Sequence, residues 1–177
     1  YKGHDQVIDA LYLLKTHNRL PPNLRWRIVG SGNDQTRLKE KVSQLHLDDH
    51  VAWLGNVSDQ RLCSEYLHCS VYIMPSFLSI TPSSSQGEGF GIAYLEAAFA
   101  GRGSIASIQG GHLDLIRDKF NGWLIDRSPD NLANLLFYLS RNPQHVIDVG
   151  AQAYITAVSD FTRISQSKAL KEWILSL

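Results

Sequence analysis

The chain of 177 residues is long enough for one domain, and its 17 Lys and Arg balance 17 Asp and Glu. This balance excludes a global charge that would draw the protein to nucleic acid or to an anionic membrane. The mean hydropathy is -0.17, and no apolar run approaches the roughly 20 residues of a membrane span, which excludes the membrane-spanning class. We therefore expect small-molecule partners.

The two cysteines and the first residues indicate the setting of the chain. Cys63 and Cys69 lie in a segment with a helical pattern and predict neither a disulfide framework nor a zinc site, so a reducing compartment fits best. We expect them to be inert thiols that are buried or half-buried. The opening YKGHDQ has no initiator Met and no signal-peptide pattern. We therefore expect a fragment that begins at a connection between a strand and a helix.

Short apolar runs alternate with longer segments of helical spacing along the chain. Asp34, Ser58 and Ser128 are suitable residues to cap helices. Residues 76–89, rich in Ser, Pro and Gly, are long for a connection inside a domain and predict an active-site loop. The expected strands are residues 26–29, 51–54, 71–74, 104–107 and 123–125. The expected helices begin after Gly3 and near Asp34, then cover residues 58–69, 90–99 and 129–140, with one or two surface helices up to residue 177.

This alternation predicts an α/β fold of the Rossmann-like kind, a parallel sheet with helices on both faces and right-handed crossovers. Such sheets bind ligands in the crevice at the carboxyl ends of their strands. The segments 30–33, 55–58, 75–89 and 107–111 all follow expected strands. We therefore expect all four to face that crevice.

Residues 87–96 (GEGFGIAYLE) are the most informative segment. Glycines at alternate positions before a helix let the backbone approach a ligand and turn unpaired amides toward an anion, which predicts a diphosphate cradle. Glu88 precedes the helix and Glu96 lies within it. Phosphates would repel both carboxylates, so they make sense as acceptors from hydroxyl groups beyond each end, those of a ribose and a hexose.

The segment resembles the E-x(7)-E signature of the retaining glycosyltransferases of family 4, whose fold, GT-B, has two Rossmann-like domains facing across a cleft. Other pieces resemble the family in the same order and cover nearly the whole chain. These pieces are Lys2-Gly3, Val29-Gly30-Ser31-Gly32, Trp53-Leu54-Gly55, Met74-Pro75-Ser76, Glu88 to Glu96 and Gly110-Gly111.

The resemblance implies a role for each matching residue. Glu96 would hold the ribose hydroxyls and Glu88 the hydroxyls of the donor sugar, while Lys2 would neutralise the diphosphate. Glu88 and Lys2 are thus the implied catalytic residues. The backbone of Val57 would bind the base, near Gly30 and Ser31. The backbone groups that would contact the sugar and the phosphates are those of Gly89, Phe90, Gly91 and Ile92.

The resemblance also implies a reaction and a domain organisation. Residues 1–177 would be the C-terminal, donor-binding domain, and an N-terminal domain absent from this chain would bind a saccharide or a lipid-linked acceptor. The donor would be a UDP-hexose, with UDP-glucose favoured, for retaining transfer without a metal or cofactor. The whole protein would be cytoplasmic and could associate peripherally with the inner face of the membrane. The fragment alone would transfer little of the donor sugar. No nucleic-acid partner is expected.

Some features depart from the family pattern, and alternatives stay open. The usual arginine before Lys2 lies outside the chain, residues 77–86 form a longer loop, and Arg102-Gly103-Ser104 replaces lysine-proline-valine. The alternatives are a GDP-mannose-dependent mannosyltransferase, a sugar-nucleotide epimerase, a phosphorylase or a catalytically silent nucleotide-binding module. A NAD site is disfavoured because the turn at residues 30–32 lacks the third glycine. Histidines are expected at the surface or in loops, and His112 adjoins the crevice.

Overall fold

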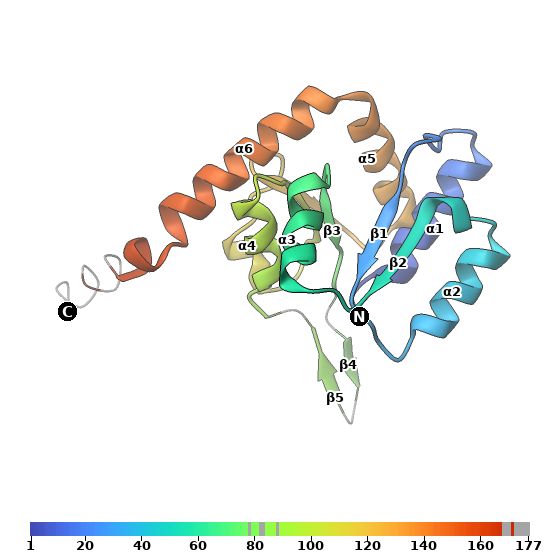
Figure 1. Ribbon diagram of the computed structural model, residues 1–177, viewed down its shortest axis with the longest axis horizontal. Helices are drawn as coiled ribbons and strands as arrows, with labels where there is room; N and C mark the ends of the chain where they lie inside the picture. Colours follow the sequence, from blue (N-terminus) through green and yellow to red (C-terminus); the bar gives the residue numbers. More distant parts are fainter. Residues whose placement is uncertain (78, 82–83, 88, 168–170, 172–177) are drawn as a thin grey trace.

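The computed structural model describes residues 1–177 except 78, 82–83, 88, 168–170 and 172–177. Strands and helices alternate along the described chain, which confirms the predicted α/β class (Figure 1). The strands are β1 (Trp26–Val29), β2 (Val51–Gly55), β3 (Tyr72–Met74), β4 (Ser79–Thr81), β5 (Ser84–Gln86), β6 (Ser104–Ser107) and β7 (Gly122–Ile125). The α-helices are α1 (His4–Thr16), α2 (Gln35–Gln44), α3 (Asp59–His68), α4 (Ile92–Phe99), α5 (Pro129–Arg141) and α6 (Pro143–Asp160), and short 3-10 turns cover Asp48–His50 and Gly111–Asp114.

The parallel strands form two separate ladders instead of the single sheet that we expected. β1 pairs with β2, whereas β6 pairs with both β3 and β7. In the second ladder Ile105 lies opposite Ile73 on one side and Trp123 on the other. Among the described residues no ladder joins β1 to β3.

Helices cover both faces of the strands, as predicted. On one face α1 and α5 pack together over the larger core, which includes Leu11, Ile28, Ile105, Trp123 and Leu132. On the other face Tyr94 of α4 packs on Ala106, and α6 packs along α4 through small alanine side chains. Both arrangements follow from the burial of apolar stripes on amphipathic helices.

Two of the three predicted helix caps form as expected. The Ser58 hydroxyl accepts a hydrogen bond from the amide of Arg61 at 3.3 Å, and the Ser128 hydroxyl accepts one from Asn131 at 3.3 Å. Asp34 precedes α2, but its side chain makes no cap and pairs with Arg37 at 3.0 Å instead. A strong cation one helical turn away competes successfully with the backbone amides for this carboxylate.

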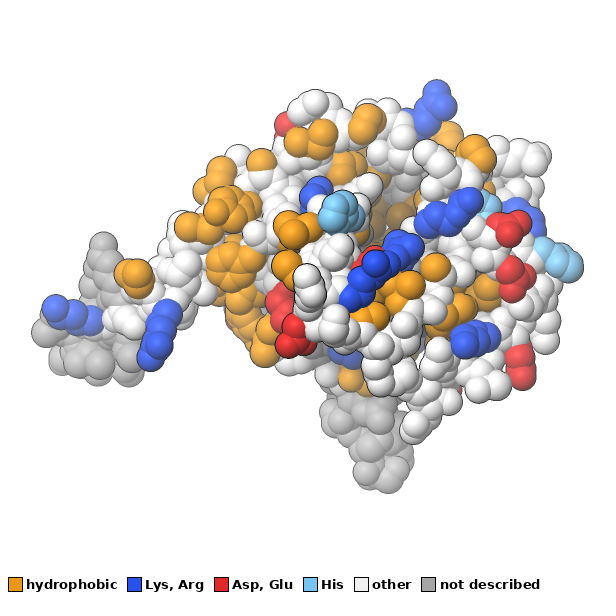
Figure 2. Space-filling view, viewed as in Figure 1, with side chains coloured by type: hydrophobic (Ala, Val, Ile, Leu, Met, Phe, Trp, Pro, Cys, Tyr) orange, Lys and Arg blue, Asp and Glu red, His pale blue; other side chains and the backbone are white. Residues whose placement is uncertain are grey.

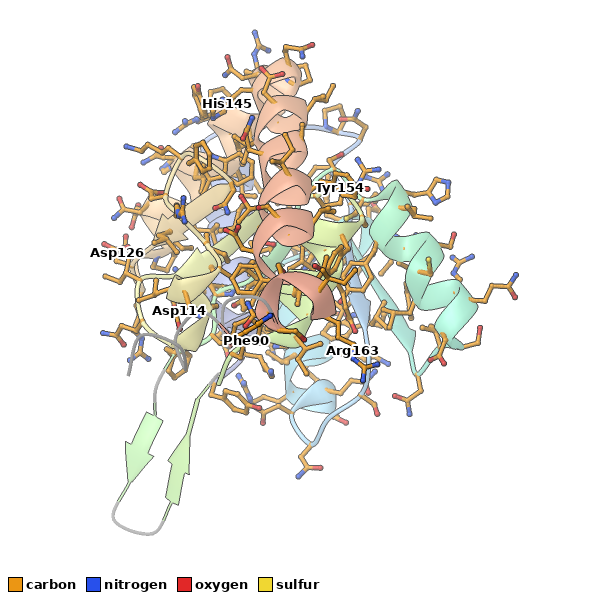
Figure 3. All side chains as sticks on the ribbon, turned by 90° about the vertical axis from the view of Figure 1, so that its left-hand side faces the viewer. Phe90, Asp114, Asp126, His145, Tyr154 and Arg163 are labelled. Carbon is orange, nitrogen blue, oxygen red and sulfur yellow. The ribbon has the colours of Figure 1, made fainter. Side chains whose placement is uncertain are left out.

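Several sequence expectations need correction. The stretch 76–89 contains an antiparallel hairpin, β4 and β5, which projects from the body in Figures 1 and 3. Each of its strands has only three residues, too few to show an alternation in the sequence. Helix α4 begins at Ile92 rather than near Phe90, because Gly91 has a left-handed backbone with φ of +79°. Cys63 is exposed, while Cys69 is half-buried and burial raises the pKa of its thiol.

Candidate functional site

The loops after β1 and β2 are tied to each other at the carboxyl end of their ladder. The amide of Gly30 donates to the carbonyl of Gly55 at 2.8 Å, and the Ser31 hydroxyl donates to the side chain of Asn56 at 3.1 Å. Val57 follows directly, half-buried, before the capped start of α3. The structure therefore brings together the residues for which we predicted contacts with the base.

The segment Lys2-Gly3 lies against the chain that leaves β3. Gly3 has φ of +81°, and a Cβ there would lie 2.4 Å from the carbonyl oxygen of Pro75, so no larger residue fits without movement. The amide of Phe77 also donates to the carbonyl of Tyr1 at 2.9 Å. Two motifs more than 70 residues apart in the sequence thus meet at one edge, and the Lys2 ammonium lies 5.1 Å from the centre of the Tyr1 ring.

The glycine segment before α4 presents its backbone to the surface. Gly89 is exposed and the Phe90 side chain is 39% exposed. Figure 3 shows Phe90 near Arg163, close to the end of α6. The centre of the Phe90 ring lies 5.7 Å from the centre of the Phe161 ring. A Cβ at Gly111 would lie 2.4 Å from the carbonyl oxygen of Gly89, so the paired-glycine motif packs directly on this segment. The positive end of α4 therefore lies at an accessible edge, where it can attract an anion.

Glu96 is exposed on α4 and pairs with a residue that sequence reasoning missed. The phenol of Tyr66, on α3, donates a hydrogen bond to a carboxylate oxygen of Glu96 at 2.9 Å. Burial and this hydrogen bond raise the pKa of Tyr66 well above its usual range, which keeps the phenol protonated as a donor. The carboxylate is thus held from one side and has acceptor capacity left for ligand hydroxyls.

Behind this pair a row of ring contacts runs through the protein. Tyr66 packs on Tyr72 at 5.7 Å, Tyr72 on Tyr94 at 5.5 Å, and Tyr94 on His112 at 4.9 Å between ring centres. The hydroxyl of Tyr94 donates to the carbonyl of Met74. We expected His112 at the surface or in a loop. It is not at the surface, because its side chain is fully buried and its Nε2 bonds the carbonyl of Ser107 at 2.8 Å.

Arg102, which departs from the family pattern, binds the C-terminal end of α3. Its guanidinium donates to the carbonyl of Tyr66 at 3.2 Å and to that of Leu67, both in the last turn of α3. Carbonyl groups at a helix C-terminus lack partners within the helix and attract cations. Arg102 therefore secures the helix that carries Tyr66, a role that the family pattern did not suggest.

The predicted residues share the edge, but they do not all line one cavity. Lys2, Gly30, Ser31 and Tyr66 line a common cleft, together with Ala93 from the first turn of α4. The cleft lining does not include Val57, the segment 89–92 or Glu96. Of these, Gly89, Phe90, Ile92 and Glu96 are exposed, Val57 is half-buried and Gly91 is buried. Glu88 lies outside the described residues, so the structure says nothing of its partners.

Among the described residues, no three His, Cys, Asp or Glu side chains come together as metal ligands. Equally, none of the helices described has both the length and the apolar character needed to cross a bilayer.

Comparisons with known proteins identify the family of the chain. The family model of Glycosyl transferases group 1 matches residues 1–155. A GDP-mannose-dependent alpha-(1-6)-phosphatidylinositol monomannoside mannosyltransferase of Mycobacterium tuberculosis is 28% identical over 166 residues, which cover 88% of this chain and 40% of that protein. The chain spans from 31% to 40% of the length of the first curated relatives that it matches.

Solved structures of glycosyltransferases share the fold. The Anabaena Alr3699/HepE structure in complex with UDP and glucose has a TM-score of 0.78 at 23% identity and covers 100% of this chain and 46% of its own. The C-terminal domain of a glycosyl transferase group 1 family protein, LpcC, from Francisella tularensis has a TM-score of 0.75 at 22% identity and covers 92% and 80% respectively. The fold is that of C-terminal GT-B glycosyltransferase domains, and the family match over most of its length shows that the chain belongs to the group 1 glycosyl transferases.

Proposed function

We propose that residues 1–177 form the C-terminal, donor-binding domain of a retaining family 4 hexosyltransferase, and that the donor is a UDP-hexose, with UDP-glucose favoured. One observation carries the proposal. The segments that follow β1, β2 and β3 and the start of α4 converge at one edge, and they bear the motifs of the family. Ligands of parallel α/β sheets bind at this edge.

The relatives support a nucleotide-sugar donor and leave two candidates for its base. HepE was solved with UDP and glucose, whereas the mycobacterial relative is named as dependent on GDP-mannose. A GDP-mannose-dependent mannosyltransferase is therefore the second candidate. The matched LpcC fragment is a C-terminal domain, which supports the proposed place of this chain in a longer enzyme.

Each site residue has a proposed task. Glu96, held by Tyr66, accepts hydrogen bonds from the ribose hydroxyls, and Glu88 accepts them from the donor sugar. Lys2 neutralises the diphosphate, and the backbone of Val57 binds the base beside Gly30 and Ser31. The remaining contacts to the sugar and the phosphates come from the backbone of Gly89, Phe90, Gly91 and Ile92.

The proposed reaction keeps the anomeric configuration of the sugar. As the glycosidic bond to the diphosphate breaks, negative charge grows on the leaving phosphate, and Lys2 and the amides at the start of α4 stabilise that charge. We propose no cofactor and no metal for this step. An N-terminal domain would bring the acceptor hydroxyl, from a saccharide or a lipid-linked saccharide, in the cytoplasm or at its membrane face.

Calorimetric titration of the protein with UDP, UDP-glucose and GDP-mannose tests the proposal. We expect saturable binding of UDP and UDP-glucose, with GDP-mannose weaker by at least about tenfold, a difference of about 1.4 kcal/mol. Tighter binding of GDP-mannose would favour the mannosyltransferase candidate. If none of the three bound at millimolar concentration, the proposed function would be wrong.

A further inference from the structure

Helix α6 is held to the body of the protein by one face and leaves the opposite face bare. The held face includes the buried residues Val149, Gly150 and Ala157. A Cβ at Gly150 would lie 2.4 Å from the carbonyl oxygen of Gly101, so the backbone of α6 lies directly on the turn that follows α4. Figure 3 shows α6 along the outside of the molecule, with Tyr154 near the middle of its length.

The bare face of α6 carries a row of apolar side chains. Ile147 is 62% exposed, Tyr154 49% and Val158 42%. The exposed Ala151 lies between the first two, and these four residues, the α6 stripe, follow one another at steps of four, three and four positions. Such steps keep side chains on one face of a helix and are typical of the seam between two packed helices. Figure 2 shows hydrophobic side chains gathered along α6.

The charges of α6 favour a second copy of the protein over a lipid surface as the occupant of this face. From Pro143 to Asp160 the helix contains no Lys or Arg, and its charged residues are Asp148 and Asp160. Helices that lie on anionic membranes carry Lys and Arg on their polar face. The chain as a whole has no net charge at neutral pH, so two copies do not repel each other at long range.

We propose that the α6 stripe is a self-association surface, on which α6 of a second copy packs antiparallel about a two-fold axis. Such an axis places residue i of one chain against residue j of the other, and j against i. With the axis at the middle of the stripe, Tyr154 meets the partner's Ala151, and Ile147 meets the partner's Val158. The larger side chain of each pair then faces a smaller one, as close packing requires. A parallel pair would instead set Tyr154 against its own copy and leave a gap between the two Ala151 side chains.

The length of the stripe limits the strength of this association. From Ile147 to Val158 the stripe spans about 17 Å at about 1.5 Å per residue. Ile155, which is 55% exposed, adds apolar area beside it. A stable interface of standard size buries about 800 Å² on each partner, and one helix face of this length supplies only part of that area. The dimer is therefore a weak one, with a Kd of about 10–100 µM.

Sedimentation equilibrium at increasing protein concentration tests this surface. We expect the average mass to rise from that of one chain, 19.9 kDa, toward that of two. Ala151→Glu sets a carboxylate against the partner's Tyr154 and should weaken association at least about tenfold. The matched control is Gln44→Glu, which makes the same change of charge at an exposed residue of α2 and should leave association unchanged.

A mixture of two variants tests the antiparallel arrangement. Tyr154→Lys alone should also weaken association. When Tyr154→Lys and Ala151→Glu chains are mixed, an antiparallel dimer brings the introduced ammonium against the introduced carboxylate and keeps one native contact between Tyr154 and Ala151. The mixture should therefore associate at least about fivefold more tightly than either variant alone. In a parallel dimer the two introduced charges do not meet, and no recovery is expected.

Three results would overturn the proposal. The first is the mass of one chain at every concentration up to about 1 mM, the second a dimer insensitive to Ala151→Glu, and the third a mixture without recovery. Binding of the single chain to vesicles of anionic phospholipid, lost in Ala151→Glu, would assign the face to a membrane instead. Circular dichroism checks that each variant keeps its helices, and Ile147→Lys, at the most exposed end of the stripe, replaces Ala151→Glu if that variant does not. This proposal does not depend on nucleotide binding.

Discussion

The two ladders differ in the interactions that surround the proposed ligand-binding edge. The β3, β6 and β7 side is held by buried contacts, the row from Tyr72 through Tyr94 to His112 and the packing of Gly111 on Gly89. The β1 and β2 side has a buried core as well, which includes Ile28 and Val42, but it also carries ion pairs at the surface. There Asp5 of α1 meets Arg37 and Lys41 of α2 at 2.7 and 2.9 Å. Buried packing contributes more free energy than exposed charge pairs. Changes to the buried contacts of the first side should therefore have larger effects on stability than changes to these ion pairs, and effects less sensitive to pH.

The largest expected effect is on Tyr94, which joins the aromatic row to Met74 and is fully buried. Tyr94→Ala should lower the free energy of unfolding by about 3–5 kcal/mol, because it leaves a cavity in a packed core. Urea unfolding measures this change. Tyr94→Phe is the matched control and should lose only the hydroxyl bond, about 1 kcal/mol. A similar loss for both variants would show that packing is not what holds this side.

The next effect concerns Glu96, the exposed carboxylate held by Tyr66. Glu96→Ala should weaken UDP binding about 10- to 100-fold, because the variant lacks the charged acceptor for the ribose hydroxyls. Glu88→Ala should leave UDP affinity nearly unchanged but weaken discrimination among UDP-sugars. Calorimetry measures both, with Glu40→Ala, an exposed glutamate on α2, as the control. Equal losses of UDP affinity for the Glu88 and Glu96 variants would mean that the two roles are misassigned.

A smaller effect is expected for Tyr66, because it acts on the nucleotide only through Glu96. Tyr66→Phe should weaken UDP binding about 2- to 10-fold by freeing the carboxylate, a loss of about 0.5–1.5 kcal/mol. In the Glu96→Ala background the same change should have no effect, which a double-mutant cycle measures. Tyr12→Phe, at a partly exposed tyrosine on α1, controls for loss of a hydroxyl. A full effect in the absence of Glu96 would contradict the positioning role.

The smallest effect is expected at Asp5, on the charged side. The hydrogen bond from Arg37, with the further pairing to Lys41, holds the pKa of Asp5 well below its usual range. Its stabilising contribution is therefore fully present above the unfolded-state pKa of about 4 and is lost as the pH falls through the folded value. Asp5→Asn should cost less than about 1 kcal/mol at neutral pH, because the pair is exposed.

Unfolding curves across pH and salt measure this contribution. The difference between the native protein and Asp5→Asn should shrink in acid and at high salt. Asp49→Asn is the control, since Asp49 is exposed and forms no ion pair with the described residues. A loss as large as that for Tyr94→Ala, or one insensitive to pH, would remove the contrast between the two sides.

Local sequence signals predicted most of the order of elements. Ser58 and Ser128 cap helices where their sequence positions indicated, because capping depends on residues only three positions away. The glycine segment before α4 was recognisable for the same reason. The hairpin within residues 76–89 was missed, because its strands have three residues each, too few to set an alternation in the sequence.

The sequence alone determined the α/β class, most of the order of elements and the family motifs, since each depends on neighbouring residues. Only the tertiary structure decided which distant groups meet. It set the hydrogen bond between Tyr66 and Glu96, 30 residues apart, the burial of His112, and the division of the strands into two ladders. These features arise from packing between elements, and hydrophobic periodicity within a single element carries no information on which partner that element will face.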